Sequence, residues 1–451
     1  MSLRSAGLRL NKASSTTPAP RLTAPAQEYS AERAFAAARL HYRATRMAPP
    51  LSKKRIVLSN ELRCFGHPLL SQLPATPGAG AQSVRVTTTH RPLGNEAFQP
   101  LPLPATPPPF RMSLESVVGQ AQIDAIRSDG KLVFHAAGDT GGIRDAVPQT
   151  VVVKKLIEQL SAAGNGPSFF YHLGDVVHFK GQAAEFYPQF YEPYEHYTAP
   201  IFAIPGNHDG MPPGDGAPPL DAFMRNFCNR VPRITPEAGD VPRTAMTQPY
   251  CHFTLEAPFV TFIGLYSNVP SGGRIHNDQL QWLIGELKAA SKQKALILAV
   301  HHPIYSADEH HGGDEHLESV IHGAFDIAKR IPQAVLSGHV HNYQRFTRQF
   351  GHRSVPYLII GAGGYHNLHG MLKAPDGGDL AVPLQITTAP SLRLERYKST
   401  RHGFARITAS ANELLFEYFT VPRRHESWSS PAMRFDSCRL NWRTGQILPS
   451  G

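Results

Sequence analysis

Short apolar runs recur along the chain from about residue 111, and each one ends in a cluster of Gly, Asp, Asn or His. These runs predict β-strands at Leu132–Ala137, Phe169–Leu173, Ile201–Ile204, Leu296–Val300 and Ala334–Leu336. Segments between them place apolar residues at helical spacing and predict helices at Val151–Ala163, Ala183–Tyr197, Asn277–Ala290 and Leu317–Arg330. Strands that alternate with helices indicate an α/β sheet whose strand-end loops carry the chemistry.

The C-terminal third has a different pattern. Residues 403–410 and 413–421 alternate between apolar and polar positions on either side of Ala411-Asn412, which predicts a hairpin. Residues 212–248 are rich in Pro and Gly and predict a long loop, whereas residues 422–451 show no clear period and predict an irregular tail. We therefore expect one catalytic domain over residues 111–421.

Residues 1–110 differ from the rest in composition. They hold 15 of the 40 prolines, and 14 Lys or Arg against 4 Asp or Glu, so they account for the whole net charge of +10. Because proline lacks an N–H donor, this leader is expected to be mostly disordered, with a short helix near Ala31–Arg46. A basic leader attracts nucleic acid or an anionic surface, and a merely solvated tail is the simpler alternative.

No run of 18 apolar residues occurs, which excludes a membrane-spanning helix. The first 27 residues are basic and resemble an organellar transit peptide, but no apolar core of a secretory signal follows them. From this start site we expect a cytoplasmic protein, and export stays open if the start is mis-assigned. The four cysteines form no Cys-x-x-Cys pair, so we expect free thiols unless export allows Cys228 and Cys251 to pair.

The strand ends carry a consistent set of metal-binding side chains. Five clusters supply Asp139, Asp175, Asn207, His301, His339 and His341. Carboxylate, amide oxygen and imidazole together suit Mn, Fe or Zn better than Ca or Mg. Each cluster alone is a weak signal, but five in order, each closing an expected strand, point to a metal site.

The ordered motifs Gly-Asp, Gly-Asp-x-x-His, Gly-Asn-His-Asp, His-x-Pro and Gly-His-Val-His resemble the calcineurin-like metallophosphoesterase superfamily. Residues 338–345 are similar to the last signature of its purple acid phosphatase branch. The resemblance implies a four-layer α/β/β/α sandwich with a dinuclear metal site at the strand ends. It implies one metal held by Asp139, Asp175 and His341, and a second held by Asp175, Asn207, His301 and His339.

One position departs from the purple acid phosphatase pattern. That branch has Tyr three residues after the bridging Asp, and its charge transfer to ferric iron gives the colour, whereas this chain has His178. Other branches place a first-motif His where Gly141 stands here. We therefore expect His178 to replace it as a ligand of the first metal; a hydrogen-bonded loop histidine is the alternative.

Four further residues match catalytic positions of the branch. The resemblance implies that His208 contacts phosphate, where it could stabilise the transition state or donate a proton to the leaving oxygen. Asp209 is expected to orient His208, and a mere loop carboxylate is an equal alternative. His310 and His311 match a histidine pair that lines the substrate pocket, although solvated loop histidines are an equal alternative. The neighbouring His302 is expected to pack beside the site.

The implied function is the hydrolysis of phosphoric esters by a metal-bridging hydroxide that attacks phosphorus in line with the leaving group. Phosphomonoesters are favoured because of the acid-phosphatase signature. A phosphodiesterase or nuclease on the same metal core is the alternative among enzymes. A metal-binding or tethering protein with weak or no catalysis is the alternative from another class. No Gly-x-Ser-x-Gly motif supports a serine hydrolase.

Overall fold

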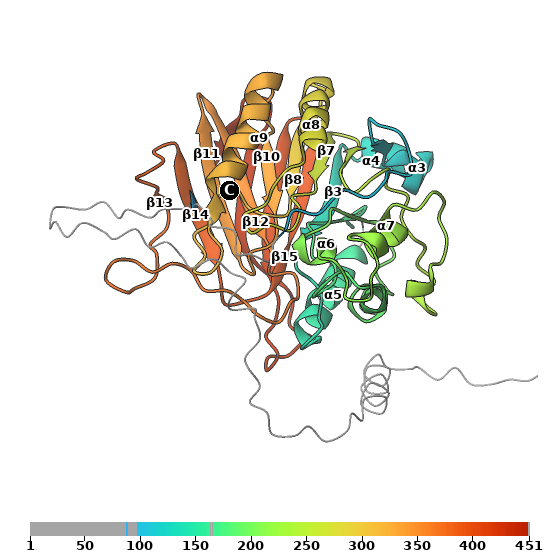
Figure 1. Ribbon diagram of the computed structural model, residues 1–451. Coiled ribbons are helices and arrows are strands. Elements are labelled where there is room, and N and C mark those ends of the chain that lie inside the picture. Colours follow the sequence, from blue (N-terminus) through green and yellow to red (C-terminus); the bar gives the residue numbers. More distant parts are fainter. Residues whose placement is uncertain (1–86, 89–96, 163, 165, 450–451) are drawn as a thin grey trace, which may run out of the picture. The chain divides into compact units, whose positions relative to one another are not determined.

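The computed structural model describes residues 87–88, 97–162, 164 and 166–449 (Figure 1). The disorder expected over residues 1–86 and 89–96, and the helix within it, lie outside the described residues. Residues 97–110 belong to the folded body rather than to a disordered leader. The Gln99 N–H donates to Asn268 Oδ1 at 2.8 Å, and Phe110 is buried. Proline prevents ladder hydrogen bonds in this segment but does not prevent packing.

Two β-sheets form the frame of the described chain (Figure 1). The strands are β1 (Thr87–Thr88), β2 (Arg111–Ser113), β3 (Lys131–Ala137), β4 (Phe170–His172), β5 (Ile201–Ala203), β6 (Phe253–Glu256), β7 (Val260–Leu265), β8 (Ala295–Val300), β9 (Gly313–Asp314), β10 (Ala334–Ser337), β11 (Tyr343–Phe350), β12 (Arg353–Ile360), β13 (Leu384–Gln385), β14 (Leu392–Lys398), β15 (Gly403–Ser410), β16 (Glu413–Thr420), β17 (Met433–Asn441) and β18 (Gln446–Leu448). A nine-stranded sheet has the order β13-β14-β11-β12-β10-β8-β7-β6-β2, and a seven-stranded sheet the order β18-β17-β16-β15-β3-β4-β5. In addition, β1 pairs with β9.

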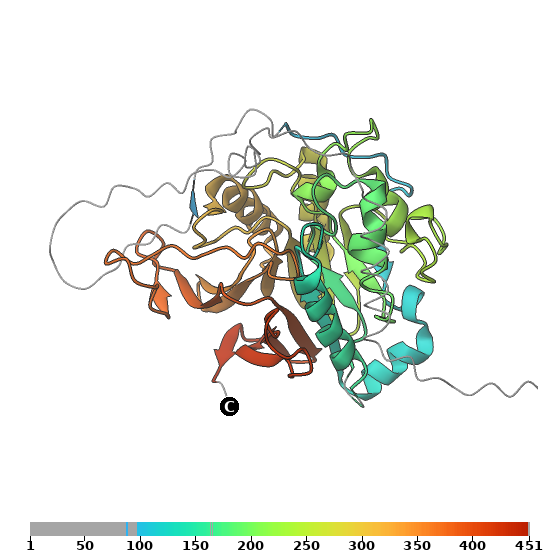
Figure 2. The same ribbon diagram turned by 90° about the horizontal axis from the view of Figure 1, so that it is seen from below.

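Helices cover the outer faces of these sheets. The helices are α3 (Glu115–Val118), α4 (Gln120–Ser128), α5 (Val147–Leu160), α6 (Asn207–Gly210), α7 (Asp221–Phe227), α8 (Asn277–Ala289) and α9 (Glu315–Ala328). Helices α8 and α9 lie side by side on the nine-stranded sheet, and α5 lies against the seven-stranded sheet (Figure 2). None of the described helices is long and apolar enough to cross a membrane.

Strand β8 shows why four layers form. All six of its side chains are buried, and they alternate between two hydrophobic clusters. Ile297 faces the cluster between the sheets, where Phe134 of β3 meets Phe262 of β7 with ring centroids 5.0 Å apart. Leu298 faces the cluster beneath α8 and α9. A strand buried on both faces reads as a continuous apolar run, so the four-layer α/β/β/α arrangement is confirmed.

The predicted strands, the hairpin and the helices α8 and α9 are confirmed within a residue or two. The helix predicted over Val151–Ala163 is confirmed as α5, which begins four residues and ends three residues earlier. The predicted helix over 183–197 is wrong. A 3₁₀ turn at Ala183–Glu185 and a π-helical turn at Tyr187–Tyr191 replace it, because Pro188 and Pro193 remove N–H donors from an α-helical ladder. The loop over 212–248 contains α7 and a 3₁₀ turn at Pro236–Ala238.

The C-terminal segment is also more regular than expected. Residues 422–451 were expected to be irregular, but they contain β17 and β18, which complete the edge of the seven-stranded sheet. The alternation in β17 is hidden in the sequence because one buried position is Asp436. Its carboxylate accepts from Arg345 Nε at 2.7 Å and from Tyr343 Oη at 2.7 Å. The described cysteines, Cys228, Cys251 and Cys438, are buried free thiols.

Candidate metal centre

The candidate ligands follow the carboxyl ends of parallel strands in both sheets. In the seven-stranded sheet, Asp139, Asp175 and Asn207 come shortly after the parallel strands β3, β4 and β5. In the nine-stranded sheet, His301 directly follows β8, and His339 follows the neighbouring parallel strand β10. Ligand sites in α/β proteins lie at such strand ends. Here two sheets contribute to one site.

Close backbone approach brings the loops together. A Cβ added to Gly206 would lie 2.0 Å from Asp175 Oδ1, and one added to Gly338 would lie 2.7 Å from Asp139 Oδ2. Three candidate ligands have a left-handed backbone conformation. The φ values of Asp139, Asp175 and His339 are 57°, 53° and 66°. Each such residue costs about 1–3 kcal/mol, so the surrounding contacts must hold it in place.

One half of the centre gathers oxygen and nitrogen acceptors. Asn207 Oδ1 lies 3.1 Å from His301 Nε2 and 2.9 Å from His339 Nδ1, and Asp175 Oδ2 lies 3.4 Å from His301 Nε2. The His301 Nδ1–H donates to Leu173 O at 2.8 Å, so Nε2 is the ring nitrogen that faces these oxygens. A metal ion at this point takes the place of a second ring proton, so the donor set fits a metal.

The other half contains buried polar atoms that make no hydrogen bond. The His341 Nδ1–H donates to Asn367 O at 2.8 Å, and its Nε2 lies 3.5 Å from Asp139 Oδ1. Neither that carboxylate oxygen nor either ring nitrogen of His178 makes a hydrogen bond. Both residues are fully buried, and buried polar atoms are rarely left unsatisfied. These atoms therefore also fit a metal ion.

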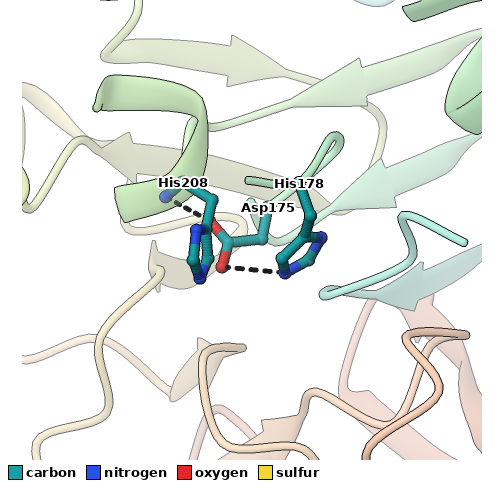
Figure 3. Close-up of side chains that lie close together, drawn as sticks. All are labelled: Asp175, His178 and His208. Carbon is teal, nitrogen blue, oxygen red and sulfur yellow. Dashed lines mark hydrogen bonds and ion pairs between the residues drawn. The ribbon is translucent and has the colours of Figure 1, made fainter. Parts of the chain in front are cut away.

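Asp175 belongs to both halves. Its ligand atom lies within 4.8 Å of those of His178 and His208 in one group, and of those of His301 and His339 in another. These are the metal-binding groups found among the described residues. Figure 3 shows the Asp175 carboxylate between His178 and His208, with the His178 Nε2 3.6 Å from Asp175 Oδ2. Asp175 is thus the residue common to the two groups, and its role as a bridging ligand stays a prediction.

Gly141 makes room for the ring of His178. A Cβ at Gly141 would lie 2.8 Å from His178 Nδ1 and 2.3 Å from Gln189 Oε1. The Gln189 side chain accepts the His178 N–H at 2.9 Å and donates to the His178 carbonyl at 2.6 Å. The ring of His178 thus fills the space beside the first motif.

The electrostatics of the centre favour bound cations. Burial raises the pKa of Asp175, but the charges of His301 and His208 outweigh it and hold that pKa well below its usual range. Burial lowers the pKa of His301, but the Asp175 charge raises it to about 9. Burial lowers the pKa of His339 well below its ordinary value. The buried carboxylate at position 175 is thus ionised and attracts positive charge.

His208 is held by the loop after β4. Its Nδ1–H donates to Phe179 O at 2.8 Å, and its backbone N–H donates to Asp175 Oδ1 at 2.9 Å. Of the two alternatives for Asp209, the contacts favour the loop carboxylate over a residue that orients the His208 ring. The Asp209 carboxylate instead accepts backbone N–H bonds at 2.9–3.1 Å, from Val176, Val177 and Gly206. Its side chain points toward the neighbouring loop, so it holds the loops after β4 and β5 together.

Residues 132–343 match the family model described as "Calcineurin-like phosphoesterase". This part of the chain is therefore a calcineurin-like phosphoesterase domain. The domain is similar to purple acid phosphatases. "Purple acid phosphatase 21" of Arabidopsis thaliana is 30% identical over 122 residues, which cover 26% of each chain. "Tartrate-resistant acid phosphatase type 5" of Rattus norvegicus is 26% identical over 264 residues, which cover 54% of this chain and 77% of the relative.

A solved structure of the purple acid phosphatase PPD1 from yellow lupin seeds aligns with a TM-score of 0.49 and 16% identity. That alignment covers 69% of this chain and 54% of the lupin protein. The chain matches only about a quarter of the length of the Arabidopsis relative. The family of the domain therefore comes from the match of residues 132–343 to the family model, whereas activity and substrate are argued from the side chains of this chain.

The phosphoesterase domain places the expected substrate histidines at different depths. His311 is buried, and its ring centroid lies 4.5 Å from that of His339. His310 is 40% exposed and lies at the rim, with its Nε2 3.3 Å from Glu309 Oε1. His302 packs beside the site, with Nδ1 2.8 Å from Ser267 Oγ.

Two residues beyond the phosphoesterase domain also reach the centre. Tyr365 stacks on His178 with ring centroids 4.1 Å apart, and the ring of His369 lies 4.2 Å from that of His341. The Gly363 N–H donates to the carbonyl of Gly138 at 3.1 Å, which anchors this loop beside the first motif. No pattern in the sequence marked either ring.

Proposed function

We propose that this protein hydrolyses phosphoric esters, phosphomonoesters above all, at a centre of two metal ions that share Asp175. The observation that carries the proposal is that two groups of candidate ligands, buried except for the half-buried His208, have Asp175 in common. A carboxylate has two oxygens and can bridge two ions, whereas a neutral imidazole offers a single lone pair. The similarity to purple acid phosphatases favours monoesters.

The ligands divide between the two ions. The first ion would be held by Asp139, Asp175, His178 and His341, and the second by Asp175, Asn207, His301 and His339. Iron, manganese and zinc suit this mixture of carboxylate, amide and imidazole. When bound, such a pair polarises phosphoryl oxygens and lowers the pKa of water so that hydroxide is available near neutral pH.

His208 is the residue that we assign to proton transfer or charge stabilisation. Its Nδ1 proton is held by Phe179 O, so Nε2 is the nitrogen left for the substrate. A fixed tautomer means that the same ring nitrogen always faces the substrate, which suits a general acid or a hydrogen-bond donor to phosphate. The position of the ring beside Asp175 and His178 supports contact with an ester bound at the metals (Figure 3).

His178 also bears on the choice of metal. Since an imidazole replaces the phenolate of purple acid phosphatases, we propose that ferric iron is not required at the first position. Its buried ring has both nitrogens without a hydrogen bond, which supports a ligand role over a loop role. Divalent manganese, iron or zinc in both positions satisfies the ligand set.

The test is metal analysis of the purified protein, with parallel assays on an aryl phosphate and a bis-aryl phosphate. We expect two ions per chain and a strong preference for the monoester. A preference for the diester would replace the phosphomonoesterase by a phosphodiesterase on the same core. Two bound ions without hydrolysis of either ester would indicate a metal-binding protein, and the absence of bound metal would refute the whole proposal.

Contact between the basic leader and nucleic acid or an anionic surface remains a separate proposal, since those residues lie outside the described part of the chain. Residues 87–88 pair with β9 and residues from 97 onward pack on the body, so the deletion that tests it ends at residue 86. Loss of polymer or vesicle binding with unchanged turnover would support tethering. Unchanged binding would remove it.

A further inference from the structure

Two loops on one side of the metal centre are joined by backbone pairing. One is the loop after β8, and the other follows the Gly-rich turn after β12. The Leu372 N–H donates to Ala307 O at 2.9 Å, and the Glu309 N–H donates to Gly370 O at 3.1 Å. The paired loops carry three imidazoles that we call the histidine wall: His310, His311 and His369.

Asp308 anchors the histidine wall through hydrogen bonds to its buried carboxylate. Its side chain is fully buried, and Oδ1 accepts the backbone N–H groups of His310 at 2.8 Å and His311 at 2.7 Å. Oδ2 accepts the Asn342 side-chain amide at 2.9 Å. Because Asn342 directly follows the metal ligand His341, one carboxylate connects the substrate loop to the last metal-binding motif.

His369 fills the space between the wall and the metal ligands. Its Nδ1 lies 3.6 Å from Asp308 Oδ1, and its backbone N–H donates to the carbonyl of His341 at 3.1 Å. Its ring centroid is 4.2 Å from that of His341 and 5.1 Å from those of His310 and His311. The residue is 2% exposed, so its ring is packed inside the protein.

We infer that Asp308 and His369 are positioning residues that hold the imidazoles of His310 and His311 on the substrate side of the metal centre. The inference rests on the proposed function. Gly312 and Gly313 follow the histidine pair, and a loop of that composition has high conformational entropy when nothing restrains it. Backbone N–H bonds to a buried carboxylate restrain it before the substrate binds, which lowers the ordering cost of binding.

The experiment compares Asp308→Ala, Asp308→Asn and His369→Gln with wild type in the full-length, metal-loaded protein. The readouts are KM and kcat for an aryl phosphate, metal ions per chain, and the affinity for inorganic phosphate by calorimetry. Asp308→Ala should raise KM and weaken phosphate binding about tenfold, with a smaller change in kcat and unchanged metal content. His369→Gln should act in the same direction.

The conservative variant separates positioning from folding. Asp308→Asn keeps an oxygen for the two backbone N–H groups and loses only the acceptor for Asn342, so its KM should lie between those of wild type and Asp308→Ala. The matched control is Glu286→Gln, a buried carboxylate that accepts from Arg111 and Thr254. Its thermal stability should fall while KM stays at the wild-type value.

Two results would overturn the inference. One is unchanged KM and phosphate affinity in Asp308→Ala with its metal retained. The other is an equal loss of bound metal, kcat and thermal stability in Asp308→Ala, Asp308→Asn and His369→Gln, which indicates a purely structural role. If wild type hydrolyses no phosphate ester, the proposed function fails, and the calorimetric comparison of phosphate affinity still decides the inference.

Discussion

Substitution of Gly206 by Ala tests how closely the metal-binding loops must approach. Gly206 has φ −92° and ψ −171°, a conformation open to alanine, so the effect of a methyl group is purely steric. That Cβ would lie 2.0 Å from Asp175 Oδ1 and 2.4 Å from Asp175 N, whereas real Cβ contacts are essentially never below 3.0 Å. The loop and the carboxylate must therefore separate by about 1 Å.

A shift of this size matters because a carboxylate binds a metal at only ~2.0–2.2 Å. A displacement of about 1 Å typically costs ~10²-fold in rate, which corresponds to about 2.7 kcal/mol of transition-state stabilisation. We expect Gly206→Ala to lose metal and at least that factor in kcat/KM for an aryl phosphate. Metal analysis and steady-state kinetics measure both quantities on the same sample.

The matched control is Gly214→Ala, eight residues along the same chain segment. A Cβ there meets no heavy atom within 4 Å, and its backbone is not left-handed. Metal content and activity should therefore equal those of wild type. Two bound ions and full activity in Gly206→Ala would refute the claim that Asp175 is held against this loop as a metal ligand.

Three further substitutions test other parts of the account. His178→Tyr, loaded with ferric iron, should gain a visible charge-transfer absorption that wild type lacks; a colourless variant with iron bound would show that position 178 does not reach the metal. His208→Gln should lower kcat by ~10²–10⁴ at wild-type metal content, and a parallel loss of metal would make His208 a ligand instead. Burial lowers the pKa of His135 to about 3 from 6.5, so the unfolded chain binds the extra proton between these values, and stability rises with pH through that window. Acidification from pH 7 to pH 5 should therefore lower the free energy of unfolding by about 2 kcal/mol through this group. Urea unfolding of the metal-free protein measures it, and His135→Gln should lack this contribution. Equal dependence of the unfolding free energy on pH in wild type and His135→Gln would contradict the prediction.

The candidate ligands were predictable because each comes shortly after a buried and mostly apolar strand. The buried run of β3 is followed within two residues by Asp139, and the run of β8 is followed directly by His301. Local sequence thus fixes both the strand and the position of the ligand at its end. The principal helices follow from the same kind of periodicity, whereas the arrangement in two sheets was implied by the family resemblance.

The remaining features depend on contacts between distant segments. Asp209 follows His208 in sequence, yet its carboxylate binds the loop of Val176 and Val177. His369 reaches the site only because its loop pairs with residues 307–309. The missed strand β17 has a buried carboxylate in place of an apolar residue, and its partner Arg345 lies 91 residues away. No local period encodes such pairs.

The central claim is that a single carboxylate at position 175 joins two metal ions, and metal stoichiometry of Asp175→Asn tests it most directly. The control is Asp278→Asn, which removes a carboxylate that is 91% exposed. We expect two ions per chain and full activity in wild type and in the control, and loss of paired metal binding together with activity in Asp175→Asn. Two ions retained in Asp175→Asn, or full activity in chelator-stripped wild type, would contradict the claim.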